Sequence, residues 1–169
     1  VGIALLFHGL DRLSRKHYNE RTWPKPIQFY LDLLHRHPIA TTFFTLFLLY
    51  LPYMIYSFPG IFTSDTVAQL ENGYVALFEK TSRLRNHHPV VHTLLLYGFS
   101  RFGATVFHSP TIGIGLFSLL QICFLFFVIG WMVQFLLERH VSARCLGLVL
   151  LFYVLSPRMR NYMFLLVKD

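Results

Sequence analysis

Long apolar runs alternate with short charged segments along this chain of 169 residues. Two of these runs, 39–58 and 110–137, contain no charged residue. Each provides the roughly 20 apolar residues that a helix needs to cross a hydrocarbon core about 30 Å thick. We therefore predict an all-α, multi-pass transmembrane protein with spans at these two positions.

Two further apolar stretches complete the predicted organisation. A span over 145–167 becomes long enough when Arg158 and Arg160 extend toward the headgroups, because its apolar centre alone is too short. Residues 1–10 are apolar but lack the basic segment that opens a secretory signal. We interpret them as the tail of an earlier span, so that the chain is a fragment of a larger multi-pass protein.

The composition supports a membrane location. Hydrophobic residues make up 54% of the chain and charged residues only 14%, and the mean hydropathy is +0.50, whereas an ordinary soluble domain carries more charge. The net charge of +7 comes from basic residues in the gaps between apolar runs. This distribution favours the lipid bilayer and phosphate-bearing substrates as partners, and no nucleic acid.

The basic residues also orient the spans, because positively charged loops stay in the cytoplasm. Residues 11–38 hold six basic and three acidic side chains, so this segment is predicted to be a cytoplasmic linker and 59–109 an external loop. If 88–107 lies at the outer interface, 138–144 form a second cytoplasmic loop and 168–169 begin a second external loop. If 88–107 crosses instead, 138–144 face outward. We prefer the interfacial arrangement because it places both basic loops inside.

The predicted external loop contains a turn and two interfacial helices. Pro59 and Gly60 end the first span, since proline lacks a donor and glycine permits a reversal. Residues 65–80 are typical of an amphipathic helix lying on the membrane; the apolar positions are Val67, Leu70, Tyr74, Leu77 and Phe78. The next helix is expected to begin at or after Pro89, because proline disfavours helix at the residue before it.

Asp65, just beyond the first span, is the main candidate for chemistry. A carboxylate there either caps the following helix or acts in catalysis, and the two roles can coexist. Arg83 and Arg85 are either interface anchors or phosphate ligands. His87 and His88, with His92 one helical turn later, offer imidazoles to a metal ion or, as we favour, to oxygens of a substrate or headgroup.

In their order along the chain, these features resemble the amino-terminal part of the GT-C superfamily. The features are Pro59-Gly60, Asp65, an amphipathic stretch, His87-His88-Pro89, two further spans, Pro157 and Lys168-Asp169. That superfamily comprises multi-pass glycosyltransferases that use polyprenyl-phosphate sugars, including protein mannosyltransferases and aminoarabinose transferases. Within it, the chain is similar to a family of bacterial membrane proteins.

The resemblance implies a role for each matching residue. Asp65 corresponds to the first-loop acid, which acts as base on the acceptor or helps to bind a divalent ion such as Mg²⁺ or Mn²⁺; Asp169 corresponds to the second-loop acid. His87 and His88 stand where other branches have a lysine or a second proline near the carrier phosphate, and Lys168 is a candidate for the same phosphate. The implied protein is a glycosyltransferase of the bacterial cell membrane, with a polyprenyl-phosphate sugar as donor and a glycan or protein as acceptor.

The alternative is a transporter or flippase subunit for a lipid-linked or anionic substrate. Such a protein should carry ionisable residues or broken helices at mid-membrane depth. The two main spans have no charged residue, and Gln121 is their main polar group at that depth. The glycosyltransferase interpretation also gives Asp65 and Asp169 a task.

The preferred topology makes Ser142 cytoplasmic. In a chain whose native cysteines are replaced by alanine, Ser142→Cys should resist a membrane-impermeant thiol reagent in intact cells and react only after permeabilisation, because the basic loop 138–144 stays inside. Strong labelling of intact cells would show instead that 88–107 crosses the membrane.

Overall fold

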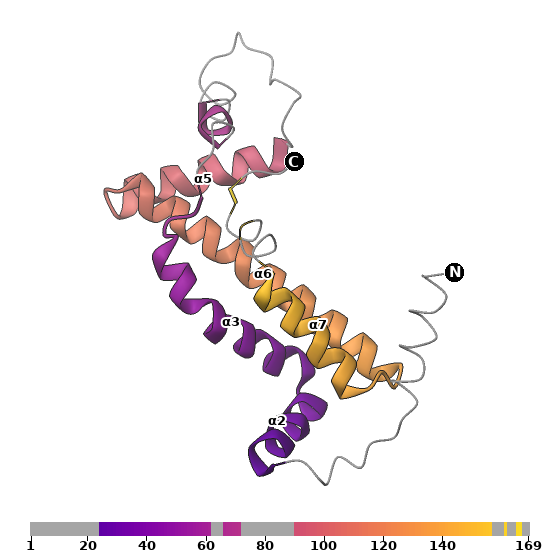
Figure 1. Ribbon diagram of the computed structural model, residues 1–169. Helices are drawn as coiled ribbons and strands as arrows, with labels where there is room; N and C mark the ends of the chain where they lie inside the picture. Colours follow the sequence, from indigo (N-terminus) through magenta and orange to yellow (C-terminus); the bar gives the residue numbers. More distant parts are fainter. Residues whose placement is uncertain (1–23, 62–65, 72–89, 157–160, 162–164, 167–169) are drawn as a thin grey trace. The chain divides into compact units, whose positions relative to one another are not determined.

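The computed structural model describes residues 24–61, 66–71, 90–156, 161 and 165–166. Within these residues the chain is all-helical, as predicted, and it forms one isolated β-bridge (Figure 1). The helices are α2 (Lys25–Arg36), α3 (Pro38–Tyr56), α5 (Val90–Val106), α6 (Pro110–Glu138) and α7 (Ala143–Leu155). Residues 66–71 are also helical.

The chain divides into two compact units, and both α3 and α6 contribute to each. The first unit comprises Val1–Tyr50 and Phe124–Pro157, and the second comprises Leu51–Cys123 and Arg158–Asp169. Each unit is described by itself below.

In the first unit, aromatic side chains of α3 pack on Phe126 of α6. The ring centroids of Phe43 and Tyr50 lie 6.2 and 5.6 Å from that of Phe126, which is fully buried. The Tyr50 hydroxyl donates a hydrogen bond to the backbone carbonyl of Tyr153 in α7. A Cβ on Gly130 would lie only 2.9 Å from the Ile39 carbonyl oxygen, so α3 and α6 approach closely where α6 has no side chain, as is common between membrane helices.

A sharp corner joins α2 to α3 in the same unit. His37 is the only residue between the two helices, and Pro38 explains the break because it disfavours helix at the preceding residue. Thr41 donates its hydroxyl to the Leu33 carbonyl over 3.1 Å. Thr45 already donates to the Thr41 carbonyl, so the 3.3 Å bond between Tyr30 and Thr45 has the Tyr30 hydroxyl as donor. These bonds hold α2 at a defined angle to α3.

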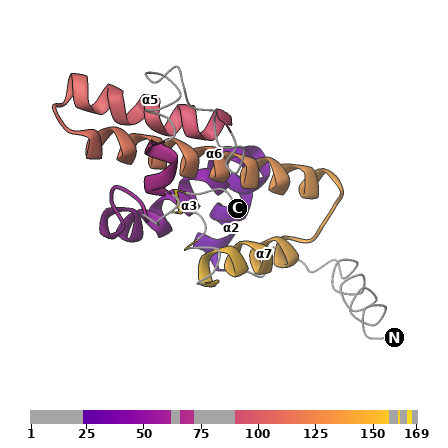
Figure 2. The same cartoon turned by 90° about the horizontal axis from the view of Figure 1, so that it is seen from above.

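In the second unit, α5 crosses the first turns of α6 (Figures 1 and 2). The backbones touch at Gly103 and Gly113, where a Cβ on Gly103 would meet Gly113 Cα at 2.5 Å. His92, about three turns earlier in α5, contacts Phe117, only about one turn later in α6. Because the contacts advance at such different rates, the two helix axes cross at an angle, although α5 touches α6 along most of its own length.

The predicted turn after α3 is confirmed. Regular helix ends at Tyr56, and the Gly60 backbone N–H closes the turn on the Ser57 carbonyl at 2.7 Å. Gly60 has φ of +139°, which side chains rarely tolerate, and a Cβ there would lie 2.8 Å from the Leu166 side chain. Ile61 then pairs with the segment 165–166: it forms a parallel bridge with Leu165, and the Leu166 N–H donates to the Ile61 carbonyl over 3.3 Å. We call this pairing, with Gly60, the junction.

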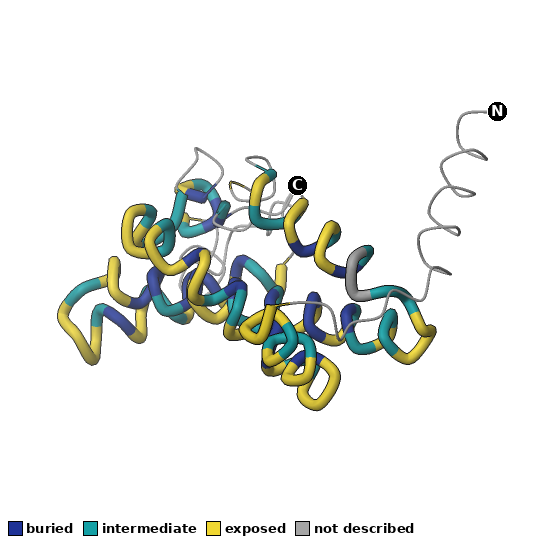
Figure 3. The backbone as a smooth tube through the Cα atoms, turned by 60° about the horizontal axis from the view of Figure 1, so that its bottom comes forward, coloured by how far each residue is buried: buried dark blue, intermediate teal, exposed yellow. Residues whose placement is uncertain are grey.

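Two of the described helices are long and apolar enough to cross a membrane, namely α3 and α6. They occupy the positions of the predicted spans 39–58 and 110–137. Exposed residues recur along the described helices (Figure 3). In α3 and α6 they include the large apolar side chains of Leu48 and Phe124, each exposed over about two-thirds of its area. Apolar exposure on this scale is expected of a surface that meets lipid or another protein.

The helix predicted over 145–167 is shorter than expected. Ser142 caps its start by accepting a hydrogen bond from the Cys145 N–H, and α7 ends at Leu155. Pro157 follows Ser156 and opposes helix there, and Leu165 takes part in the junction instead of a helical turn. The segment beyond Leu155 therefore does not continue as one regular helix.

The contact between α5 and α6 predicts how two glycines differ. Gly103→Ala should lower the free energy of unfolding by about 1–3 kcal/mol, because the added methyl group would meet the backbone of Gly113 and Ser109, which cannot rotate away. Gly98→Ala in the same helix should leave stability unchanged or raise it, since a Cβ there meets nothing within 4 Å and alanine favours helix. Thermal unfolding of both variants in detergent would check this; equal stability would contradict the crossing.

Candidate functional site

The residues that the sequence singles out for chemistry all lie outside the described residues. These are Asp65, Arg83, Arg85, His87, His88, Lys168 and Asp169. Their flanking residues are described, however. Thr66 follows Asp65 directly, α5 begins two residues after His88, and Leu166 precedes Lys168 by two residues.

These flanking segments meet at one apolar cluster in the second unit. The cluster consists of Leu96 from α5, Ile114 and Phe117 from α6, and Leu166, each at most 5% exposed. Leu70, from the helical residues 66–71, and Phe99 pack against it. We call these four buried residues the central cluster. It is the place where three segments, far apart in the sequence, are held together.

Polar side chains are buried next to the central cluster. Thr66 and Gln69 are fully buried, and Thr93 is 2% exposed. Thr66, Gln69 and Leu70 share one face of their helix because residues three and four apart are neighbours. Of the apolar positions predicted for the amphipathic helix over 65–80, Leu70 packs on the central cluster and Val67 remains half exposed.

His92 and Gln69 form the most specific polar contact in this region. Nδ1 of His92 lies 2.9 Å from Oε1 of Gln69. A carbonyl oxygen only accepts, so Nδ1 carries the proton and donates it. In the neutral ring, Nε2 is then the nitrogen with the lone pair. The edge of the imidazole also meets the Phe117 ring at 5.3 Å and 77°, which restricts rotation of the ring.

The junction brings a second set of polar groups to α6. Ser118, 5% exposed, has its hydroxyl beside Gly60, and the Gln121 amide donates to the Leu165 carbonyl over 3.4 Å. Within the described part of the chain, Oε1 of Gln121 is buried without a hydrogen-bond partner. Gln121 is therefore not simply an isolated polar group within an apolar span: it contacts the segment that precedes Lys168 and Asp169.

The described residues provide no metal site of their own. No group of three histidine, cysteine, aspartate or glutamate side chains comes together among them. Of the histidines proposed to share a helical face, His92 is described, and it is bound to Gln69. The acids predicted to bind a divalent ion, Asp65 and Asp169, fall outside the described ranges.

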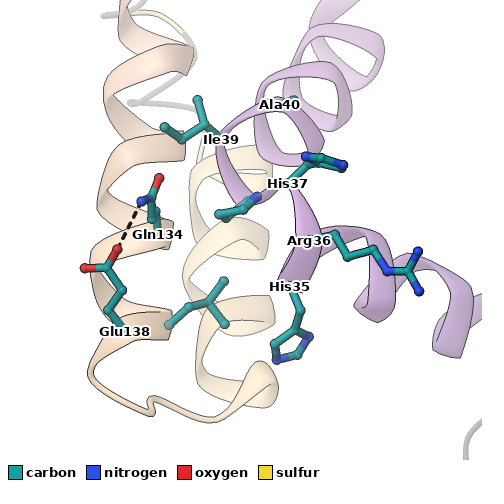
Figure 4. A pocket seen from close by; sticks show the side chains of 9 residues that line it. His35, Arg36, His37, Ile39, Ala40, Gln134 and Glu138 are labelled. Carbon is teal, nitrogen blue, oxygen red and sulfur yellow. Dashed lines mark hydrogen bonds between the residues drawn. The ribbon is translucent and has the colours of Figure 1, made fainter.

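A separate pocket of about 630 Å³ lies at the corner between α2 and α3 in the first unit (Figure 4). Its lining includes His35, Arg36 and His37 from the corner. From α6 it includes Gln134 and Glu138, whose side chains are joined by a 3.0 Å hydrogen bond. We call it the corner pocket. It contains none of the residues that the sequence predicts to act in chemistry.

Sequence reasoning missed the buried polar residues Thr66, Gln69, Thr93 and Ser118. A signal existed for one pair, because Thr66 and Gln69 recur at helical spacing directly after Asp65. Nothing in the pattern indicated that Gln69 would meet His92, which is 23 positions away. That pairing depends on how the helices pack.

Residues 11–169 match the model of a family of unknown function, DUF6020. No curated protein and no solved structure matches the chain. The match covers both units and every residue that the sequence singles out.

The pairing of His92 with Gln69 can be measured by a double-mutant cycle. Gln69→Leu should lower the free energy of unfolding by about 1–3 kcal/mol, since it leaves the imidazole N–H without this acceptor. His92→Leu combined with Gln69→Leu should cost less than the sum of the single changes, with a coupling of about 0.5–1.5 kcal/mol. Glu71→Gln, at an exposed position of the same helix, is the matched control and should have no effect. Strict additivity would show that the pair does not form.

Proposed function

The chain belongs to the DUF6020 family, and we propose that it is part of a multi-pass membrane glycosyltransferase of the GT-C type. It moves a sugar from a polyprenyl-phosphate carrier to a glycan or protein acceptor at the outer face of a bacterial cell membrane. Asp65 is the proposed catalytic base. Asp169 is the second acid of the same site.

One observation carries this proposal: the segments adjoining the two acids are packed on the same central cluster. Thr66 is bonded directly to Asp65, and its helix packs on the cluster through Leu70. Asp169 follows Leu166 by three residues, a length of chain that reaches at most about 11 Å. Covalent geometry limits how far each carboxylate can lie from these segments, which supports a shared active site.

The junction also supports a common membrane depth for the two acids. Ile61 and Leu166 are hydrogen-bonded to each other. The segments that lead from them to Asp65 and Asp169 therefore start from the same depth. This agrees with the topology in which Asp65 and Asp169 face the same side.

The proposed chemistry is an inverting displacement at the sugar's C1. Asp65 removes the proton of the acceptor hydroxyl as its oxygen forms a bond to C1, and the bond from C1 to the carrier phosphate breaks with its electron pair. The phosphate leaves as an anion at headgroup depth. Arg83, Arg85, His87, His88 and Lys168 are the proposed groups that bind it. Asp65 and Asp169 are the candidate ligands for Mg²⁺ or Mn²⁺.

A polar pair close to the site in sequence supports this chemistry. Gln69 and His92 lie four residues after Asp65 and His88 respectively, and they hold each other through one hydrogen bond. Such a pair gives the helix that follows Asp65 a fixed rotation on α5. Positioning of this kind contributes to displacement reactions as much as acid-base strength does.

A transporter or flippase subunit is the alternative, and the described spans favour it less. Between Pro110 and Leu137, α6 carries no ionisable acid or base apart from Cys123, and α3 continues as a helix through its internal Pro52. Neither helix has the interruption at mid-depth that transporters use for binding. Substrate binding in this protein is therefore expected at the helix ends.

The decisive experiment is sugar transfer by membranes containing the full-length protein. With radiolabelled polyprenyl-phosphate sugars as donors, Asp65→Asn should lower the rate by at least about 100-fold, because the amide cannot accept the proton. Membrane insertion should be unchanged. Glu71→Gln, which neutralises an acid six residues further on, should retain activity.

Two outcomes would contradict the proposal. Activity retained by Asp65→Asn would remove this residue from the mechanism, and failure of the wild type with every donor would favour transport. A parallel assay with EDTA reports on the divalent ion: loss of transfer, restored by added Mg²⁺ or Mn²⁺, is the result expected if the acids hold a metal.

A further inference from the structure

We propose that α2 is an interfacial helix that binds the anionic lipid surface of the leaflet at which α3 begins. Its Phe29 and Leu33 side chains enter the boundary between headgroups and acyl chains. This inference rests on the proposed membrane location, but it is independent of glycosyl transfer.

The faces of α2 fit this placement. Leu34 is buried against the protein, whereas Phe29 is 71% and Leu33 38% exposed. Phe29 and Leu33 are one turn apart, so they form one exposed apolar stripe beside the buried face. Asp32 and Arg36, three residues after Phe29 and Leu33 respectively, are exposed along the edge of this stripe. The apolar arc of the helix is thus wider than the part that the protein covers.

The corner sets the depth of this stripe. Only His37 separates α2 from α3, and the hydroxyl bonds of Tyr30 and Thr41 fix the angle between the helices. If α3 crosses the bilayer, α2 must end within a residue or two of the level at which α3 begins. At that depth, the exposed apolar stripe with Phe29 contacts lipid in place of water, which favours this position of the helix.

Charge at the corner matches an anionic surface. Arg36 ends α2, and its guanidinium points away from α6 into the open (Figure 4). His35 and His37 flank it and also line the corner pocket, and Lys25 lies at the other end of α2. Segment 11–37 carries six basic and three acidic residues. Basic side chains next to a membrane span are attracted to anionic phospholipids.

Fluorescence quenching of the full-length protein in nanodiscs tests this placement. A single cysteine is introduced by Phe29→Cys, Asp32→Cys or Leu48→Cys, with Cys123 and Cys145 replaced by alanine, and it is labelled with a polarity-sensitive dye. Two quenchers are compared: iodide in the water and a nitroxide-labelled phospholipid in the bilayer. We expect position 29 to be quenched several-fold more by the lipid nitroxide than position 32, and several-fold less by iodide.

Position 48 shows whether α3 itself is in the membrane. Leu48 is exposed at the middle of α3, so iodide should not reach it. Access of iodide there would overturn both the membrane location and this inference. With position 48 protected, iodide quenching at 29 equal to that at 32 would overturn the inference alone. Protection of position 29 from both quenchers would show that protein covers the stripe, which also overturns it.

The lipid composition tests the anionic preference. Nanodiscs containing phosphatidylglycerol should give stronger nitroxide quenching at position 29 than discs of phosphatidylcholine alone, and Arg36→Gln should reduce this gain. Equal quenching in the two lipids would contradict an anionic partner. None of these readings depends on sugar transfer, so failure of the proposed enzyme activity would leave them unchanged.

Discussion

Burial of Leu166 against Leu96, Ile114 and Phe117 is the contact on which the candidate site depends. These side chains come from segments that the sequence separates widely, and no covalent link joins them. The contact therefore has to offset the conformational entropy of ordering several connecting segments. Gly60 makes it possible, because any larger residue would collide with the Leu166 side chain. Anything that loosens this contact would separate the two acids of the proposed active site.

Polar and apolar burial have different roles in this protein. The central cluster supplies non-directional attraction, whereas the bond between Gln69 and His92 fixes the rotation of one helix on another. On the outside, the helices expose large apolar side chains that water would not stabilise. Such an apolar surface is suited to contact with lipid or with another protein.

The proposed glycosyl transfer and the proposed interfacial helix both depend on a lipid whose phosphate lies at the membrane surface. A polyprenyl carrier has an apolar tail and a phosphate at headgroup depth, and so does a phospholipid. Basic side chains at helix ends can serve either ligand. At the end of α3 that leads to Asp65, the proposed site adds two acids for chemistry, while at the α2 end the exposed Phe29 and Leu33 add only the proposed anchoring.

Apolar runs and prolines by themselves determined the helices α3, α5 and α6, because span length, helix termination and the restriction before proline are local properties. Asp65 was chosen from its position just after the first apolar run, whereas Asp169 was chosen only through the resemblance to a known superfamily. The early end of α7, the pairing of Ile61 with the segment 165–166, and the contact of Gln69 with His92 were decided only by tertiary packing. They join residues distant in sequence, and such contacts depend on side-chain shape and on the crossing of two helices at glycines, which no local pattern encodes.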